Sequence, residues 1–100
     1  MTNKDYCDYE TALKLCALGY PGTAWILLYS AQKWLREEKK VIIVIVPYTY
    51  NIITETSTWT YEIWLEDNLE REVHDFNTYE EALSVGIKEA VRILKEEDND

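Results

Sequence analysis

The residues best suited to acid–base chemistry lie near the end of the sequence's acidic stretch. His74 is the only histidine, and Asp75 follows it directly. Adjacent residues of a strand point to opposite faces, so this pair does not form a general base with an orienting carboxylate. With neither a nucleophile nor a second metal ligand paired to it, we expect His74 to be a surface or strand histidine and predict no catalytic residue.

Carboxylates near this histidine could in principle hold a hard cation. A calcium loop needs a fixed ligand spacing around a glycine, and that spacing is missing, so a solvated acidic edge is the better interpretation. The chain also lacks the glycine spacing of a nucleotide-binding loop, and we predict no metal site and no cofactor. The carboxylates are Glu66, Asp67, Glu70, Glu72 and Asp75, and the glycines are Gly19, Gly22 and Gly86.

Cys7 and Cys16 are the only cysteines. A disulfide framework needs more, and no secretory signal pattern is seen, so we expect reduced thiols in a cytoplasm. We interpret Cys16 as a small buried hydrophobic residue.

Aromatic residues form the one group with the character of a binding surface. Cross-strand aromatic pairs usually pack a sheet, so a core or an oligomer interface is one interpretation. A small-ligand pocket and a peptide groove are the others. Trp64 is the exception in the group, because alternation places it on the polar face, where it covers something or meets a partner. The candidates are Tyr48, Tyr50, Trp59, Tyr61 and Trp64.

The aromatic residues lie in a region that we predict to form three strands. Val41–Val46 is six β-branched residues in a row and is apolar on both faces. Pro47 removes a backbone donor, so the strand is at an edge there or is bent. Residues 48–53 continue as a strand or enter a loop.

The second strand is predicted at Thr56–Leu65, where apolar and polar residues alternate. A hairpin turn at Glu66–Asn68 leads to a weaker strand at Leu69–Phe76. We expect one face of the second strand to meet the helices, namely Trp59, Tyr61, Ile63 and Leu65. The residues expected to face away are Thr58, Thr60 and Glu62.

The last helix has the clearest pattern. Asn77 and Thr78 both offer N-caps, each with a glutamate three residues later. We expect the helix to run to about Lys95, followed by a frayed acidic tail at residues 96–100. Gly86 lies within the apolar stripe, which indicates close backbone contact with the sheet or a neighbouring helix. The stripe comprises Tyr79, Ala82, Leu83, Ile87, Ala90, Val91 and Leu94.

A first helix is predicted from an N-cap at Asp8 to about Leu18, closed by Gly19. Its apolar face is read at helical spacing as Tyr9, Ala12, Leu13 and Cys16.

A second helix ends in a charged stretch at residues 36–40, with Ala31, Trp34 and Leu35 on one face. Its start has two interpretations. We favour a helix that begins at Ala24 behind a Thr23 cap, because Ala, Leu and Ile suit a buried helix. The alternative is a short strand at Trp25–Tyr29 with Ser30 as the cap.

Together these elements predict one α+β domain over residues 1–100, in the order α-α-β-β-β-α. We expect a three-stranded antiparallel meander with the helices packed mainly on one face.

The charge distribution excludes some partners. Residues 1–50 hold six Lys/Arg and five Asp/Glu, whereas residues 51–100 hold four and fourteen, and the net charge is −9. An acidic half repels phosphate backbones and anionic membranes, so we predict neither nucleic acid nor membrane as a partner. Hydrophobic residues make up 47% of the chain, which is enough for a packed core.

Three segments together resemble a group of short uncharacterised proteins from anaerobic gut bacteria and their phages. They are Tyr9-Glu10-Thr11-Ala12-Leu13-Lys14-Leu15 with Gly19-Tyr20, Ala31-Gln32-Lys33-Trp34-Leu35-Arg36-Glu37, and Phe76-Asn77-Thr78-Tyr79-Glu80-Glu81-Ala82-Leu83. The resemblance implies a bacterial or phage cytoplasm and no activity.

We therefore expect a non-enzymatic interaction protein that forms a homodimer through Val41–Val46, with Val44 in the interface. One alternative is a small-molecule binder that uses the aromatic residues, for example a phage protein that sequesters a host signalling nucleotide. A further alternative is an acidic decoy of a DNA-binding protein.

Overall fold

The computed structural model describes residues 5–22, 25–51 and 56–98. The sheet has the antiparallel order β1-β2-β3, and the predicted α+β meander is confirmed. The elements in chain order are α1 (Tyr9–Ala17), α2 (Leu28–Glu38), β1 (Val41–Asn51), β2 (Thr56–Leu65), β3 (Asn68–Phe76) and α3 (Tyr79–Asp98).

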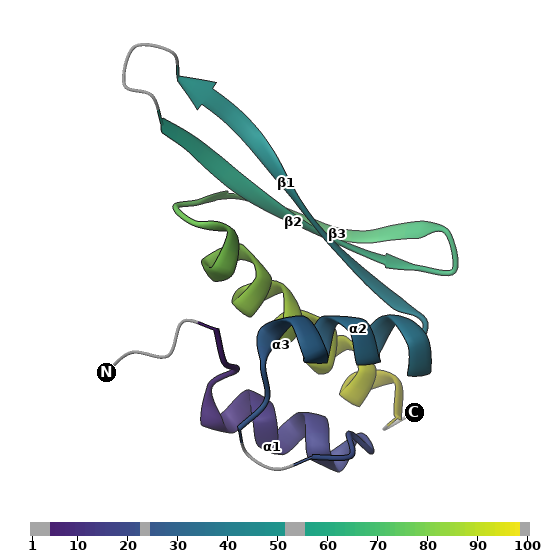
Figure 1. Ribbon diagram of the computed structural model, residues 1–100. Helices are drawn as coiled ribbons and strands as arrows, with labels where there is room; N and C mark the ends of the chain where they lie inside the picture. The colour runs from purple at the N-terminus through teal and green to yellow at the C-terminus, as the bar shows by residue number, and fades with distance from the viewer. Residues whose placement is uncertain (1–4, 23–24, 52–55, 99–100) are drawn as a thin grey trace.

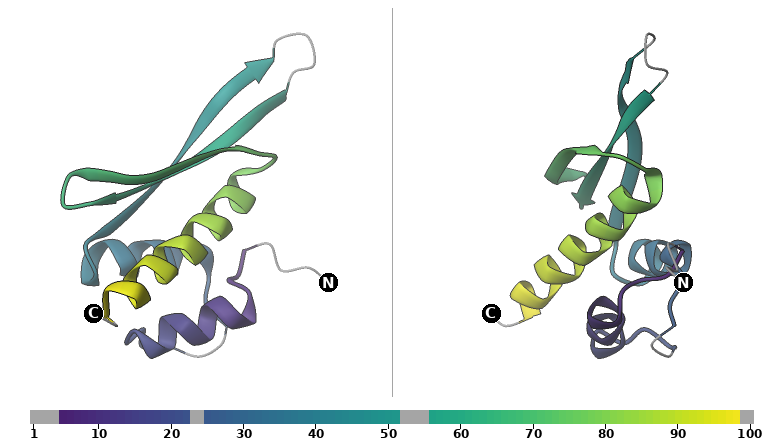
Figure 2. Two further views of the ribbon diagram at one scale, coloured as in Figure 1. Left: turned by 180° about the vertical axis from the view of Figure 1, so that it is seen from behind. Right: turned by 90° about the vertical axis from the view of Figure 1, so that its left-hand side faces the viewer.

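The helices lie on one side of the sheet (Figures 1 and 2). α3 contacts all three strands, α2 contacts β1 and α3, and α1 packs against α3. β1 and β2 continue past the start of α3, so the last part of β1 and the first part of β2 project away from the helices (Figure 1). None of the described helices covers the opposite face of the sheet.

The core lies between α3 and the sheet, and the predicted stripe of α3 is confirmed. Ala82, Leu83, Ile87, Ala90 and Val91 are fully buried, Leu94 is 9% exposed and Tyr79 is half-buried. A Cβ atom at Gly86 would lie 3.2 Å from Cγ2 of Ile43, so the close contact expected of this glycine is with the sheet.

The predicted caps at both ends of α1 and at the start of α3 are also confirmed. Oδ1 of Asp8 accepts a hydrogen bond from the Thr11 amide at 2.7 Å, and Oγ1 of Thr78 accepts one from the Glu81 amide at 3.0 Å. Of the two caps proposed for α3, Thr78 is therefore the one used. Gly19 has φ +109°, the left-handed conformation that closes α1.

The predicted facing of β2 is confirmed, with one addition. Tyr61 and Ile63 are buried against the helices, and Trp59 and Leu65 are partly buried there. Thr60 points to the opposite face, yet it is only 1% exposed. Its hydroxyl lies 2.8 Å from Nδ1 of His74 on β3, and this cross-strand neighbour covers it.

The pairing of β1 with β2 contains one irregularity. The register of β1 against β2 shifts between Pro47 and Thr49, as expected of a proline in an edge strand.

The β2–β3 turn is shorter than predicted. It comprises Glu66 and Asp67 alone, with φ of 49° and 68°, which is typical of a two-residue hairpin turn.

The face predicted for α1 is confirmed for Ala12 and Cys16, which pack in or against the core, and is wrong for Tyr9 and Leu13. Tyr9 is 69% and Leu13 is 48% exposed, whereas Thr11, Ala12 and Leu15 are buried. The helix is apolar on more than one side, so helical spacing alone allowed two faces. The side that packs on α3 is the side on which Asp8 lies. Oδ2 of Asp8 is 2.9 Å from Nζ of Lys88 on α3.

The favoured start of α2 is also wrong. The helix begins at Leu28, and Leu27 is extended and forms a bridge with Tyr6, which is closer to the alternative with a short strand. The backbone explains this difference, since Cys7 donates to the Ile26 carbonyl and Leu28 to the Asp5 carbonyl, both at 2.8 Å. Tertiary pairing thus overrides helix propensity. Thr23 and Ala24 lie outside the described residues.

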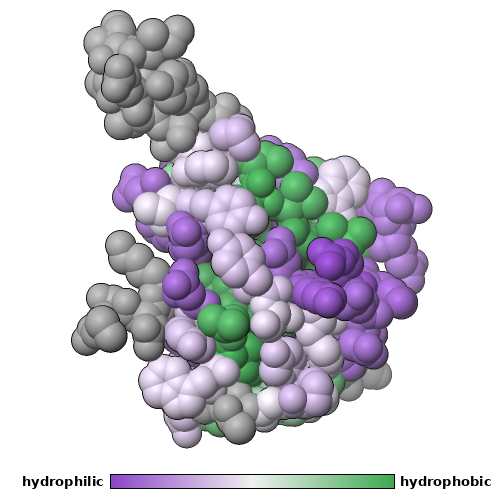
Figure 3. All heavy atoms as spheres, in the orientation of Figure 1, coloured by the Kyte–Doolittle hydropathy of each residue, from purple (hydrophilic) through white to green (hydrophobic). Residues whose placement is uncertain are grey.

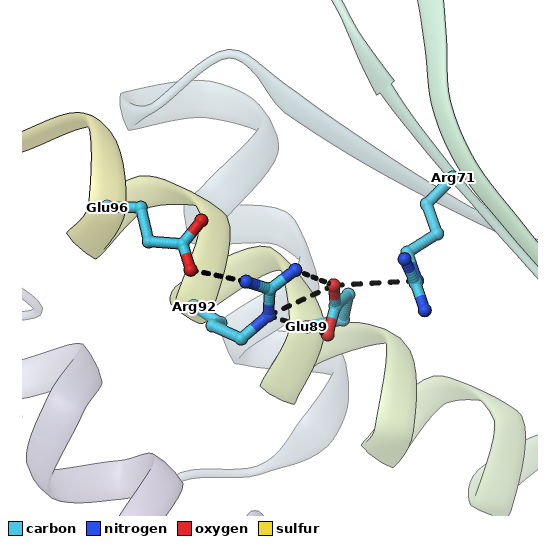
Figure 4. A network of polar contacts seen from close by, with 4 residues as sticks. All are labelled: Arg71, Glu89, Arg92 and Glu96. Atoms are coloured by element: carbon cyan, nitrogen blue, oxygen red, sulfur yellow. Dashed lines mark hydrogen bonds and ion pairs between the residues drawn. The ribbon is translucent and has the colours of Figure 1, made fainter.

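The last helix extends further than predicted, to Asp98, so residues 96–98 are not a frayed tail. Arg92 pairs with Glu96 one turn later and with Glu89 (Figure 4). Nε of Arg71 on β3 also lies 3.4 Å from Oε1 of Glu89, which ties the sheet to the helix. The hydrogen bonds from Arg92 lower the pKa of Glu89.

Cys7 and Cys16 are not joined in a disulfide, and Cys7 rather than Cys16 is the buried one. Burial, with a smaller contribution from the Asp8 charge, raises the pKa of Cys7 to about 12. Within the described ranges, no helix combines the length and apolar composition that a membrane crossing requires.

Candidate functional site

The face of the sheet opposite the helices is the main candidate site, and we call it the outer face. Its composition follows from the register, because directly paired residues of antiparallel strands share a face. Trp64 pairs with Ile42 on one side and with Leu69 on the other. Ile42 and Leu69 are each 44% exposed, and Trp64 is half-buried. One end of the outer face is therefore an apolar row across all three strands.

The next row is acidic at its centre. Glu62 pairs with Val44 of β1 and with Glu72 of β3. Like charges placed directly opposite are destabilising in a sheet. Each carboxylate has a local donor: Nε1 of Trp64 donates to Glu62 at 3.0 Å, and Nε2 of His74 lies 3.0 Å from Oε1 of Glu72.

His74 is thus better connected than the sequence indicated. It lies between Glu72 and the Thr60 hydroxyl, an arrangement of hydroxyl, imidazole and carboxylate that resembles a hydrolase triad. The Thr60 side chain is only 1% exposed, however, so its hydroxyl is closed to a substrate. The arrangement can join β2 to β3, and its geometry does not favour nucleophilic catalysis.

The aromatic residues singled out in the sequence do not form one surface. Tyr61 is buried and packs on Phe76, with ring centroids 5.6 Å apart. Trp59 meets Tyr79 of α3 edge-on at 5.6 Å. Of the three candidates whose side chains are described, Trp64 alone belongs to the outer face. The side chains of Tyr48 and Tyr50 lie outside the described part of the chain.

Val44 is half-buried on the outer face beside Glu62, so it lies where the self-association hypothesis needs it. The carboxylates around the β2–β3 turn are exposed, as a solvated edge would be. In the described part of the chain, no three His, Cys, Asp or Glu side chains are grouped in a way that could hold a metal ion.

A second feature escaped the sequence patterns altogether. A cavity of 420 Å³ lies between the segment before α1, the segment before α2 and the first turns of α3. Its lining joins residues far apart in the chain, and no local spacing marks them. We call it the Tyr6–Trp25 groove, and it is lined by Tyr6, Cys7, Asp8, Trp25, Thr78, Glu80, Glu81, Ser84 and Val85.

Comparisons with protein-family models, with curated proteins and with solved structures found no match to this chain.

Proposed function

We propose that this chain is a non-enzymatic interaction protein of a bacterial or phage-infected cytoplasm that pairs with a second copy of itself through the outer face. The observation that carries the proposal is the apolar row of Ile42, Trp64 and Leu69 on the face of the sheet opposite the helices, where Ile42 and Leu69 are exposed and Trp64 is half-buried. Burying such side chains contributes about 1.5–3 kcal/mol each when burial is complete.

The strand that the sequence marked for self-association supports this surface. β1 is an edge of the sheet, and its residues Ile42, Val44 and Val46 lie on the outer face. Figure 3 shows hydrophobic side chains along β1, next to strongly hydrophilic ones on the β2–β3 hairpin. This division between an apolar strand and a polar hairpin is typical of an interface centre and its rim.

Packing of face on face is favoured over pairing of β1 edge to edge. Nε2 of Gln32 on α2 donates to the Ile43 carbonyl at 2.7 Å. α2 therefore already contributes a hydrogen bond to this strand, and an edge engaged by a helix is less open to strand addition.

The acidic row does not prevent a second copy from binding. Glu62 lies two residues from Trp64 along β2, a distance of about 6.6 Å in a strand. A two-fold axis that passes Trp64 at right angles to β2 would set the Glu62 residues of the two copies about 13 Å apart along the strand direction, because each then lies on its own side of the axis. That separation exceeds the screening length of roughly 8 Å at physiological salt.

Charge placed on the outer face tests the proposal. We expect Ile42→Glu and Val44→Glu to convert a dimer into a folded monomer, measured by size exclusion with light scattering and by circular dichroism. Leu13→Glu is the matched control, because Leu13 is 48% exposed on α1, away from the sheet. Dimers that persist in both outer-face variants would refute this surface.

A stable monomer that instead binds basic proteins would also refute self-association and would favour the acidic decoy. The nucleotide alternative gains no support from the Tyr6–Trp25 groove, because its described lining has three carboxylates and no Lys, Arg or His.

A further inference from the structure

The Tyr6–Trp25 groove is built from parts that the fold holds in place. Tyr6 and Leu27 form an antiparallel bridge, and backbone hydrogen bonds of 2.8 Å flank it. Opposite these segments stands the first part of α3, from Thr78 to Val85. The salt bridge between Asp8 and Lys88 joins α1 to α3 beside it. A hollow framed by paired backbone and a capped helix is largely pre-formed, as small-molecule sites usually are.

Two aromatic rings form a corner of this groove. The rings of Tyr6 and Trp25 stand at 85° to each other, with centroids 5.7 Å apart. Trp25 is 71% exposed, so most of its surface is open to solvent or to a ligand. A face of such a ring that stays exposed attracts cations through its quadrupole.

The charge of the groove's lining also favours a cationic ligand. Asp8, Glu80 and Glu81 contribute three carboxylates, and none of the described residues that line the groove is Lys, Arg or His. Lys88 already pairs with Asp8, and the N-terminus of α3 adds about half a positive charge. Glu80 and Glu81 are therefore the carboxylates that a bound cation would meet. Burial acts to raise the pKa of Asp8, but hydrogen bonds from Lys88 and from Thr11 lower it to about 2, so Asp8 stays ionised.

The remaining lining argues for an organic cation rather than a bare metal ion. Val85 and the buried Cys7 offer apolar surface for methyl or methylene groups. Among the residues that the structure describes, no ligand set for a metal is present. The volume of 420 Å³ falls in the range of about 300–1,000 Å³ found for small-molecule sites.

We propose that the Tyr6–Trp25 groove binds a small organic cation, an alkylammonium whose charged head lies in the aromatic corner and faces the carboxylates. This site is separate from the outer face and does not depend on the proposed self-association.

The test is a titration of the full-length protein by isothermal calorimetry and by amide chemical shifts. The probes are choline, its uncharged isostere 3,3-dimethylbutan-1-ol, 1,4-diaminobutane and inorganic phosphate. We expect choline or the diamine to bind roughly tenfold or more tightly than the neutral isostere, and phosphate not to bind. Shift changes should centre on Tyr6, Trp25 and the first turn of α3.

Variants separate this groove from other aromatic surfaces. Trp25→Ala should weaken binding of the cation roughly tenfold. Adding Glu80→Gln and Glu81→Gln should weaken binding further, and this additional loss should be largest at low salt. Tyr9→Ala is the matched control, since Tyr9 is an exposed aromatic residue of α1 that does not line the groove. The proposal is overturned if neither cation binds, if the isostere binds equally well, or if folded Trp25→Ala binds like the wild type.

Discussion

Gly86 on α3 lies so close to Tyr61 on β2 that a Cβ atom at this glycine would stand 3.3 Å from both Cβ and Cγ of the tyrosine. The glycine therefore sets how closely the helix approaches the sheet. Helix propensity alone would make Gly86→Ala stabilising by about 1 kcal/mol.

We expect Gly86→Ala to be destabilising instead, by about 1 kcal/mol net, because overpacking a core costs about 1–3 kcal/mol. Urea denaturation measures the free energy of unfolding. Ser84→Ala on the same helix is the control for propensity and should be neutral or slightly stabilising. A Gly86→Ala protein about 1 kcal/mol more stable than wild type would contradict the close packing.

Ile87 is fully buried in the stripe of α3, so Ile87→Asp should unfold the protein. An unpaired buried charge costs several kcal/mol, against a total stability of roughly 5–15 kcal/mol. Val85→Asp is the control, because Val85 is 36% exposed on the same helix. Circular dichroism should show a folded Val85→Asp and an unfolded Ile87→Asp, and a folded Ile87→Asp with unchanged melting would refute the stripe.

The pairing of Asp8 with Lys88 predicts a dependence of stability on pH. The pKa of Asp8 is lowered from 3.8 to about 2, so its contribution is present above about pH 4 and is lost as the pH falls towards 2. The pKa of Lys88 is raised above its usual 10.5, so its contribution to stability is present below about pH 10.5 and is lost at higher pH.

We expect Asp8→Ala to lower the free energy of unfolding by about 1 kcal/mol at neutral pH, chiefly through loss of the α1 cap. The salt bridge adds little, since the Asp8 side chain is 46% exposed. Urea titrations between neutral and acidic pH should show the difference from wild type shrinking towards pH 2. A difference that stays constant over this range would rule out Asp8 as its source.

The two thiols should differ in reactivity. Cys7 is 8% exposed with its pKa raised to about 12, so little thiolate forms at mild pH, whereas Cys16 is partly exposed. With Ellman's reagent we expect one fast thiol in the native protein and two after denaturation. The Cys16→Ser variant should lose the fast reaction and Cys7→Ser should keep it, and the reverse pattern would contradict the placement of α1.

The elements with strong local signals could be predicted from the sequence. The apolar stripe of α3, the Thr78 cap and the alternation of β2 each depend on neighbours a few residues away. The start of α2 could not, because residues 25–28 pair with residues 5–7 at the other end of α1. Local propensity carries no information about that partner.

The two candidate sites differ in the same way. The apolar outer side of β1 was visible in the sequence as β-branched residues on both faces. Whether this side of β1 forms one row with Trp64 and Leu69 depends on the strand register. That register is shifted by bulges, including one between Ile63 and Trp64. The Tyr6–Trp25 groove needs three segments to meet, so only the folded arrangement shows it.

The mass of the wild-type protein in solution tests self-association most directly. At micromolar concentration, size exclusion with light scattering should give about twice the chain mass of 11.8 kDa. The net charge of −9 opposes association, so the dimer fraction should rise between about 0.05 and 0.5 M NaCl as repulsion is screened. A monodisperse monomer at both salt concentrations, even at millimolar protein, would contradict the account.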